Sequence, residues 1–117
     1  MPSVPIEIKV QKKQKRLVIE YSNKQSYELS FEYLRVHSPS AEVKGHGQGQ
    51  EVLQLNKENV SIESVLPVGN YAIKLIFDDG HDSGIYTWKY LQELGENKAK
   101  YWRAYLDRVK ASRYTSI

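Results

Sequence analysis

The side chains best suited to chemistry lie close together in one short stretch of the chain. It carries carboxylates, an imidazole and a hydroxyl at Asp78, Asp79, His81, Asp82 and Ser83. A histidine beside a carboxylate and a serine provides the ingredients of general acid–base or nucleophilic catalysis. Neighbours in sequence need not meet in triad geometry, however, and the G-x-S-x-G turn that presents a catalytic serine is absent. We therefore predict no independent catalysis and keep an enzyme as an alternative.

Two further histidines could complete a metal site with His81. His37 and His46 precede it, and Asp79 or Asp82 would supply a carboxylate. Three imidazoles and a carboxylate suit zinc or another divalent cation. The chain has no cysteine, which excludes disulfides and thiolate ligands within it. His46 lies in a glycine-rich loop over residues 44–50, so metal binding would have to order that loop.

The bulk composition is that of one globular domain over residues 1–117. The 117 residues are 40% hydrophobic and 26% charged, which is neither a disordered nor a membrane composition. No apolar run reaches the roughly 18 residues of a transmembrane helix, and the first residues lack the pattern of a signal peptide. We therefore expect a cytoplasmic protein with no membrane partner.

The periodicity predicts an α+β fold. The expected strands lie near residues 6–10, 17–21, 27–31, 53–55, 60–66 and 71–77, with the last one central because both its faces are apolar. Ser30 is expected to cap a short helix through Arg35, and an irregular turn should follow at residues 38–43. Thr87 should cap a helix that Gly95 ends, and Asn97 should cap an amphipathic helix over residues 97–113. The prediction is thus a mainly antiparallel β-sheet of about five to six strands, with a short helix after the third strand and two C-terminal helices.

The terminal helix is predicted to have one apolar stripe. Its members are Trp102, Tyr105, Leu106 and Val109, which share one face at helical spacing. Packing of this stripe against the core is the expectation, with partner binding as the alternative.

Charge is segregated along the chain. Residues 1–24 carry six Lys and Arg against two acids, residues 95–117 carry six against two, and the middle carries five against ten. Basic flanks allow a nucleic-acid binder that uses residues 12–16 and the terminal helix as an alternative function. Nothing aromatic is interleaved with the lysines of residues 12–16, so we expect no nucleic-acid partner.

Three segments in order resemble a known family. They are YLRVHSPSA at residues 33–41, VGNYAI at residues 68–73 and DGHDSGIYTW at residues 79–88. Over residues 17–94 the chain resembles the gamma-butyrobetaine hydroxylase-like N-terminal domain family, as a small stand-alone bacterial-type member. The resemblance implies a small α+β module with an accessory or interaction role. By analogy alone it places such modules near iron–sulfur assembly or quinone-related metabolism.

The chain departs from the family where the family resembles a structural zinc module. The three cysteine positions fall on Ser38, Ser40 and Val43, and only His81 of the four ligands is present. Because structural zinc needs four N or S ligands, we expect no cofactor, with zinc at His37, His46 and His81 as the alternative.

His81 has a plainer interpretation than metal binding. We expect it to bond to Ser38, to Ser40 or to their backbone, and so to hold two segments together. Asp78 or Asp79 would accept backbone N–H groups in the turn, while Gly80 and Gly84 take positive φ.

The predicted function is a non-catalytic accessory or protein-interaction module of unknown specific role. Binding is expected through the acidic turn at residues 78–82 and the loop at residues 38–49, because loops on a rigid scaffold usually carry binding. The partner and the oligomeric state are left open. The residues expected to matter are Arg35, His37, His46, Asp79, His81 and Tyr86.

Overall fold

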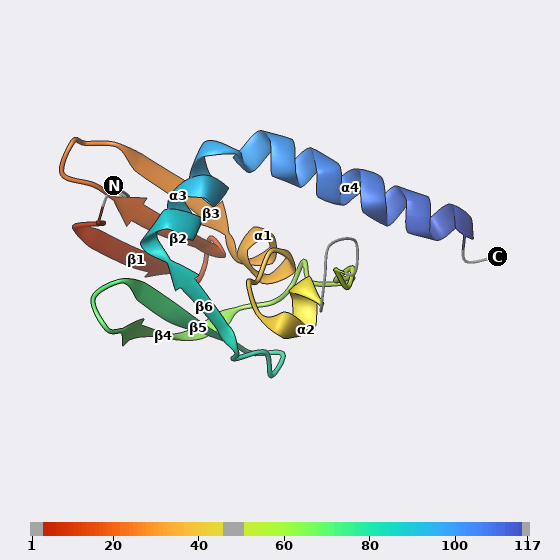
Figure 1. The fold of residues 1–117 in the computed structure, drawn as a ribbon, viewed down its shortest axis with the longest axis horizontal. Helices are drawn as coiled ribbons and strands as arrows, with labels where there is room; N and C mark the ends of the chain where they lie inside the picture. The colour runs from red at the N-terminus through yellow and green to blue at the C-terminus, as the bar shows by residue number, and fades with distance from the viewer. Residues whose placement is uncertain (1–3, 46–50, 116–117) are drawn as a thin grey trace.

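The computed structural model describes residues 4–45 and 51–115, with the side chains of the last two described residues left aside. Six strands and four helices follow one another within these ranges (Figure 1). They are β1 (Glu7–Gln11), β2 (Arg16–Glu20), β3 (Ser26–Ser30), α1 (Phe31–Val36), α2 (Ala41–Lys44), β4 (Ile62–Val68), β5 (Ala72–Phe77), β6 (Gly84–Thr87), α3 (Trp88–Glu96) and α4 (Lys98–Thr115). None of the described helices is both long and apolar enough to cross a membrane.

The first sheet is an antiparallel meander in the order β1-β2-β3. Its three strands lie within one residue of the predicted positions. In the register Val10 faces Leu17, and Leu17 faces Leu29 on the other side. Leu17, Ile19 and Leu29 are fully buried, because alternation places them on the face turned to the core.

The second sheet is also an antiparallel meander, in the order β4-β5-β6. The expectation of a single sheet was wrong, because alternation assigns a face to each strand but does not name the strand beside it. As predicted for the strand near residues 71–77, β5 is central. Side chains of both sheets, including Ile19 and Leu29 from the first and Leu75 and Phe77 from the second, share one core cluster.

One predicted strand is absent, and one strand that forms was not predicted. Residues 53–55 form no strand, and hydrogen bonds hold that segment: Val52 N–H donates to the Val43 carbonyl, and the Tyr105 hydroxyl donates to the Gln54 carbonyl. Strand β6 was not predicted, because its four residues lie inside a stretch that reads as turn. It pairs with β5 from Gly84 to Thr87 and places Tyr86 in the core.

The helix starts follow the predicted caps. The Ser30 hydroxyl accepts from the Tyr33 N–H, and the Thr87 hydroxyl accepts from the Tyr90 N–H. The irregular turn expected at residues 38–43 instead contains α2, capped by the Ser40 hydroxyl.

The junction of α3 and α4 differs from the prediction. Gly95 lies inside α3 rather than ending it, with the Tyr27 ring packed where a Cβ would stand. Asn97 follows α3 as its C-cap and donates its side-chain amide to the Glu93 carbonyl. The chain then turns directly into α4 at Lys98.

Helix α4 extends away from the body of the domain (Figure 1), which gives the molecule extents of 49 × 28 × 27 Å. Tyr105 is buried and Trp102 and Val109 are half-buried, as the predicted stripe requires. Leu106 is 48% exposed, so its assignment to the buried stripe was wrong. Much of this helix therefore remains open to solvent.

Candidate functional site

The turn from β5 to β6 is fixed by its own acidic side chains. Asp78 Oδ1 accepts from the Ser61 N–H at 3.0 Å, and Asp79 Oδ1 accepts from the His81 N–H at 3.1 Å. Gly80 adopts φ 89°, as predicted. Gly84 does not take positive φ; its need for glycine is steric, because a Cβ there would lie 2.5 Å from Ser38 Oγ.

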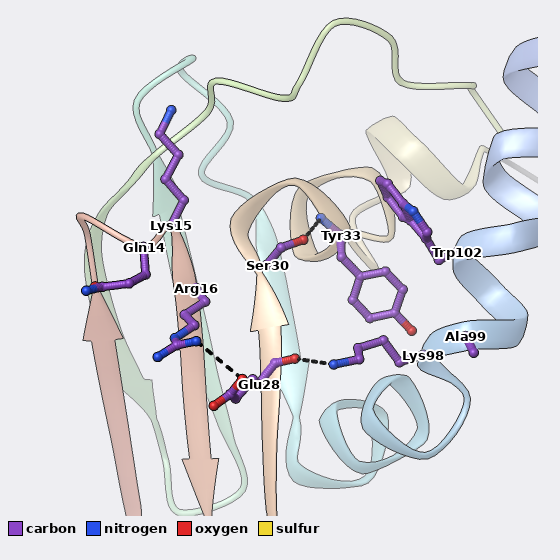
Figure 2. A pocket seen from close by; sticks show the side chains of 9 residues that line it. All are labelled: Gln14, Lys15, Arg16, Glu28, Ser30, Tyr33, Lys98, Ala99 and Trp102. Atoms are coloured by element: carbon purple, nitrogen blue, oxygen red, sulfur yellow. Dashed lines mark hydrogen bonds and ion pairs between the residues drawn. The ribbon is translucent and has the colours of Figure 1, made fainter.

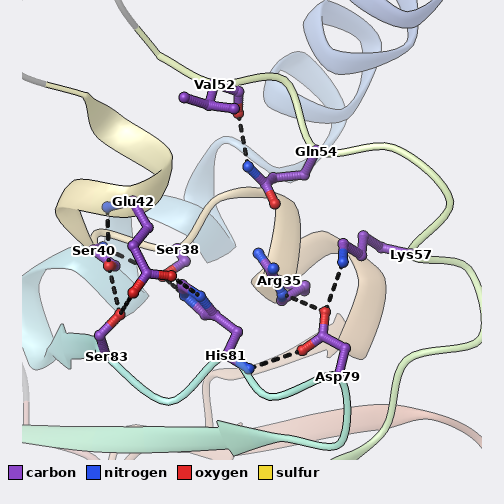
Figure 3. Close-up of polar contacts among 10 residues, drawn as sticks. All are labelled: Arg35, Ser38, Ser40, Glu42, Val52, Gln54, Lys57, Asp79, His81 and Ser83. Carbon is purple, nitrogen blue, oxygen red and sulfur yellow. Dashed lines mark hydrogen bonds and ion pairs between the residues drawn. The ribbon is translucent and has the colours of Figure 1, made fainter.

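His81 joins this turn to the segment between α1 and α2, as the plainer interpretation predicted (Figure 3). Its side chain is buried, with Nε2 at 2.8 Å from Ser38 Oγ and Nδ1 at 3.2 Å from Glu42 Oε2. A carboxylate can only accept, so Nδ1 carries the proton and Nε2 accepts from the Ser38 hydroxyl. Burial lowers the pKa of His81, and the nearby Arg35 charge lowers it further, which favours this neutral tautomer.

A second chain of hydroxyls runs beside the imidazole and ends on the same carboxylate. Ser83 Oγ donates to Glu42 Oε1 at 3.3 Å, so the 2.6 Å contact between Ser40 Oγ and Ser83 Oγ uses the Ser40 proton. Ser40 Oγ also accepts from the Glu42 N–H at 3.2 Å as the cap of α2. Glu42 thus receives bonds from both His81 and Ser83 and ties α2 to the β5–β6 turn (Figure 3).

The connectivity from Ser38 to His81 to Glu42 is that of a serine hydrolase triad. Its exposure is reversed, however: Ser38 is 0% exposed, whereas the Glu42 side chain is 70% exposed. A nucleophile must be reached by its substrate, while the acid of a triad orients the imidazole from within. Here Ser38 is covered by the backbone at Gly84, where even a Cβ would not fit. The arrangement cross-links segments, and Ser38, which holds the place of the nucleophile, is not accessible to solvent.

Asp79 forms a second polar cluster on the other side of the same turn. Its Oδ2 accepts from Arg35 Nε at 2.9 Å and from Lys57 Nζ at 2.8 Å (Figure 3). Burial opposes ionisation of this carboxyl, but the hydrogen bonds from Lys57, the His81 main chain and Arg35 prevail and lower its pKa to about 2. Asp79 is therefore ionised at any ordinary pH and neutralises one of two adjoining cations.

Two of the residues expected to contact a partner lie in the interior. Arg35 is 6% exposed, and its Nη1 has no hydrogen-bond partner among the described residues. Tyr86 is fully buried and donates its hydroxyl to the Leu34 carbonyl at 2.6 Å. In this structure both residues support the fold beneath the turn, and neither offers its side chain to a partner.

His37 has a different environment from His81. Its Nδ1 lies 2.8 Å from the Tyr33 carbonyl oxygen, and its ring packs against Tyr33, Tyr101 and Tyr105. Burial lowers the pKa of His37, with the Tyr33 carbonyl opposing that effect. His46, the third histidine of the predicted metal site, lies outside the described residues.

The positions of the family's zinc ligands do come together, but their side chains do not fit zinc. Ser38 is bonded to His81, Ser40 is bonded to Ser83, and Val43 is buried and apolar. Neutral hydroxyls and a methyl-bearing side chain do not replace three thiolates. Within residues 4–45 and 51–115, no three His, Asp or Glu side chains are grouped to hold a metal ion.

Sequence reasoning missed Glu42 and Lys57. Glu42 stands in the first turn of α2, directly after the Ser40 cap, where an acidic residue favours a helix start. Recognising that helix start would have directed attention to Glu42. Lys57 lies 22 positions before its partner Asp79, and no local pattern connects the two.

Comparisons with known proteins identify a family for most of the chain. The family model described as "Gamma-butyrobetaine hydroxylase-like, N-terminal" matches residues 8–92. No curated protein matches the chain.

Solved structures extend the likeness to most of the chain. Two solution NMR structures are each 48% identical with a TM-score of 0.82; they cover 95% and 96% of this chain and 83% and 88% of their own. A crystal structure of a DUF971-family protein of unknown function from Acidithiobacillus ferrooxidans is 36% identical with a TM-score of 0.66, covering 79% of this chain and 92% of its own.

The matched residues include both β-sheets except Glu7, the first residue of β1, and the whole Ser38–His81 contact region. The chain belongs to the family of gamma-butyrobetaine hydroxylase-like N-terminal domains.

Proposed function

We propose that this domain is a non-catalytic accessory module that binds another protein. The observation that carries the proposal is the reversed exposure of the Ser38–His81–Glu42 cluster. Its nucleophile is buried and its carboxylate faces solvent. The cluster therefore holds surface residues in place, and we propose that a second protein binds to that surface.

The proposed binding surface combines acidic residues with exposed apolar ones, and we call it the acidic face. Its acidic members are exposed, and its apolar members Val52 and Leu55 are 53% and 43% exposed. Apolar side chains rimmed by charge are typical of sites where proteins associate. The acidic face comprises Glu42, Glu51, Val52, Leu55, Glu58, Asp78 and Asp82.

Both apolar members of the acidic face, with Glu51 and Glu58, lie on a segment that the domain holds in place. The Val52 N–H donates to the Val43 carbonyl at 2.7 Å, which fixes the segment beside α2. The Tyr105 hydroxyl donates to the Gln54 carbonyl at 2.6 Å, and Lys57 bonds to Asp79. An irregular segment secured at several points binds with little loss of conformational entropy. A partner that places apolar side chains among Lys and Arg would complement this face.

The test is affinity capture with matched variants of exposed residues. The double variant Val52→Ser, Leu55→Ser should lose a partner that the unaltered domain retains. Leu66→Ser is the control, because Leu66 is 44% exposed on a different element, β4. Retention by the double variant together with loss by the control would place binding elsewhere and refute the proposal. Thermal melts of all variants establish that each is folded.

A further inference from the structure

A cavity of about 420 Å³ lies on a different part of the domain, between the first sheet and the start of α4 (Figure 2). It is formed by the β1–β2 turn, the facing strands β2 and β3, the start of α1 and the first turns of α4. It shares no residue with the acidic face. Its lining residues are Gln14, Lys15, Arg16, Glu28, Ser30, Tyr33, Lys98, Ala99 and Trp102.

The cavity is basic, because Arg16 and Lys98 stand against one carboxylate, Glu28. The third lining cation, Lys15, instead donates its Nζ to the Asn59 carbonyl at 3.2 Å. Arg16 Nη1 bonds to Glu28 Oε2 at 3.3 Å, and Lys98 Nζ bonds to the Glu28 main-chain carbonyl at 2.9 Å (Figure 2). The Glu28 side chain is 55% exposed, so its pairing with Arg16 is screened by water and exchanges readily for a stronger anion. Lys98 donates one N–H to a neutral carbonyl, so its positive charge remains available to a ligand.

One wall of the cavity is aromatic. Trp102 stacks on Tyr105 with ring centroids 5.1 Å apart, and it makes a T-shaped contact with Tyr33 at a centroid distance of 6.3 Å. These contacts hold the half-buried indole in place, and the indole still lines the cavity. A fixed aromatic ring beside basic side chains is the arrangement that binds a nucleobase and its phosphate together.

We propose that this cavity binds a nucleotide unit, with the base against Trp102 and the phosphate between Arg16 and Lys98. The volume is of the size that encloses one small ligand, and it is too small for a folded partner segment. A phosphate satisfies two cations at once, and a planar base uses the aromatic wall that a simple anion would leave empty. The unit would come from a free nucleotide or from single-stranded nucleic acid.

The experiment is a titration of the isotopically labelled domain followed by NMR, read at the two tryptophan indole N–H groups. The probes are inorganic phosphate, thymidine monophosphate and ten-residue oligothymidylate. We expect the Trp102 indole resonance to move with the last two probes. The Trp88 indole is an internal control, because it is fixed by a 2.8 Å hydrogen bond to the Asn70 carbonyl. Trp88→Phe assigns the two resonances without altering the cavity.

The relative affinities of the two thymidine probes show whether the nucleotide unit comes from a free nucleotide or from single-stranded nucleic acid. Equal binding of both thymidine probes indicates a free nucleotide, whereas tighter binding of the oligomer, weakening as salt increases, indicates a single strand. Either result supports a nucleotide site.

Matched charge variants give the refuting outcomes. Lys98→Gln should weaken binding about fivefold, as expected for one exposed ion pair. Lys100→Gln, on the same helix but outside the cavity lining, should leave it unchanged. Equal losses in the two variants would reveal general electrostatic attraction and overturn the proposal. An unmoved Trp102 resonance with thymidine monophosphate and oligomer would also overturn it, whether or not phosphate binds.

Discussion

Replacing His81 with alanine tests whether the imidazole cross-links the two segments. The change removes a buried ring that bonds to Ser38 at 2.8 Å and packs near Phe77, with ring centroids 6.1 Å apart. A buried hydroxyl left without its acceptor costs about 1–3 kcal/mol, and the space left by the ring costs about 1–2 kcal/mol more. The contact with Glu42 adds little, because that side chain is 70% exposed. We expect a loss of about 3 kcal/mol of unfolding free energy.

Thermal and urea unfolding at pH 7.5 measure this loss. For a domain of this size, about 3 kcal/mol corresponds to a fall in Tm of about 10–15 °C. Ser38→Ala and the double variant complete a cycle in which the double variant costs about 1 kcal/mol less than the sum of the single ones. Asp82→Ala, at the exposed neighbour of His81, should change stability by at most about 0.5 kcal/mol.

The pH dependence provides a second measurement of the same contact. The folded state lowers the pKa of His81 below its ordinary value, so the unfolded chain binds the proton more readily. The contribution of neutral His81 is full above about pH 6.5 and declines as the pH falls through the folded pKa. The stability gap between the unaltered domain and His81→Ala should therefore narrow from pH 7.5 to pH 5.

A Tm for His81→Ala within about 2 °C of the unaltered domain would refute the reasoning, since it would mean that the buried contact contributes no net stability. Additive energies in the cycle would likewise show that Ser38 and His81 are not coupled.

Three further predictions concern residues around this contact. Asp79→Asn should make the free energy of unfolding, followed by circular dichroism, depend less on pH in the acid range. The pKa of about 2 means that the ionised Asp79 carboxylate stabilises the fold above about pH 4, by about 1–2 kcal/mol after solvent screening. This contribution is lost in the unaltered domain as the pH falls towards 2. Gly84→Ala should lower the free energy of unfolding in urea by about 2–3 kcal/mol, because the added Cβ would lie 2.5 Å from Ser38 Oγ. Adding Ser38→Ala to the same chain should recover part of that loss. If the second substitution recovers none of it, the steric explanation is contradicted. Ser30→Ala should cost about 1 kcal/mol in the same assay by removing the cap of α1, with Ser26→Ala on the same strand as the control.

The sequence predicted what depends on neighbouring residues. Alternation located β1, β2, β3 and β5, and the cap residues Ser30 and Thr87 located two helix starts. These features follow from periods of two and 3.6 residues and from a hydroxyl within one turn of a free N–H, so a short window of sequence contains them. Segment composition also predicted the glycine turn at Gly80.

Partnership between distant segments was decided by the tertiary structure. Ser38 and His81 are 43 positions apart, and Glu42 and His81 are 39 apart. The family pattern suggested the first pair, but no pattern indicated the second or the reversed exposure of the cluster. Burial depends on which backbone covers a side chain, here Gly84 over Ser38, and that is a property of the packed chain.

The basic cavity shows the same division. The sequence contained Arg16, Lys98 and Trp102 in segments that gave no reason to be combined, and the lysines of residues 12–16 lacked aromatic neighbours. Folding places α4 beside the first sheet and brings the aromatic ring to the cations. Local spacing thus determined the elements and their apolar faces. The packing of the sheets and helices against one another decided which polar groups meet, because hydrophobic burial fixes those distances without regard to separation along the chain.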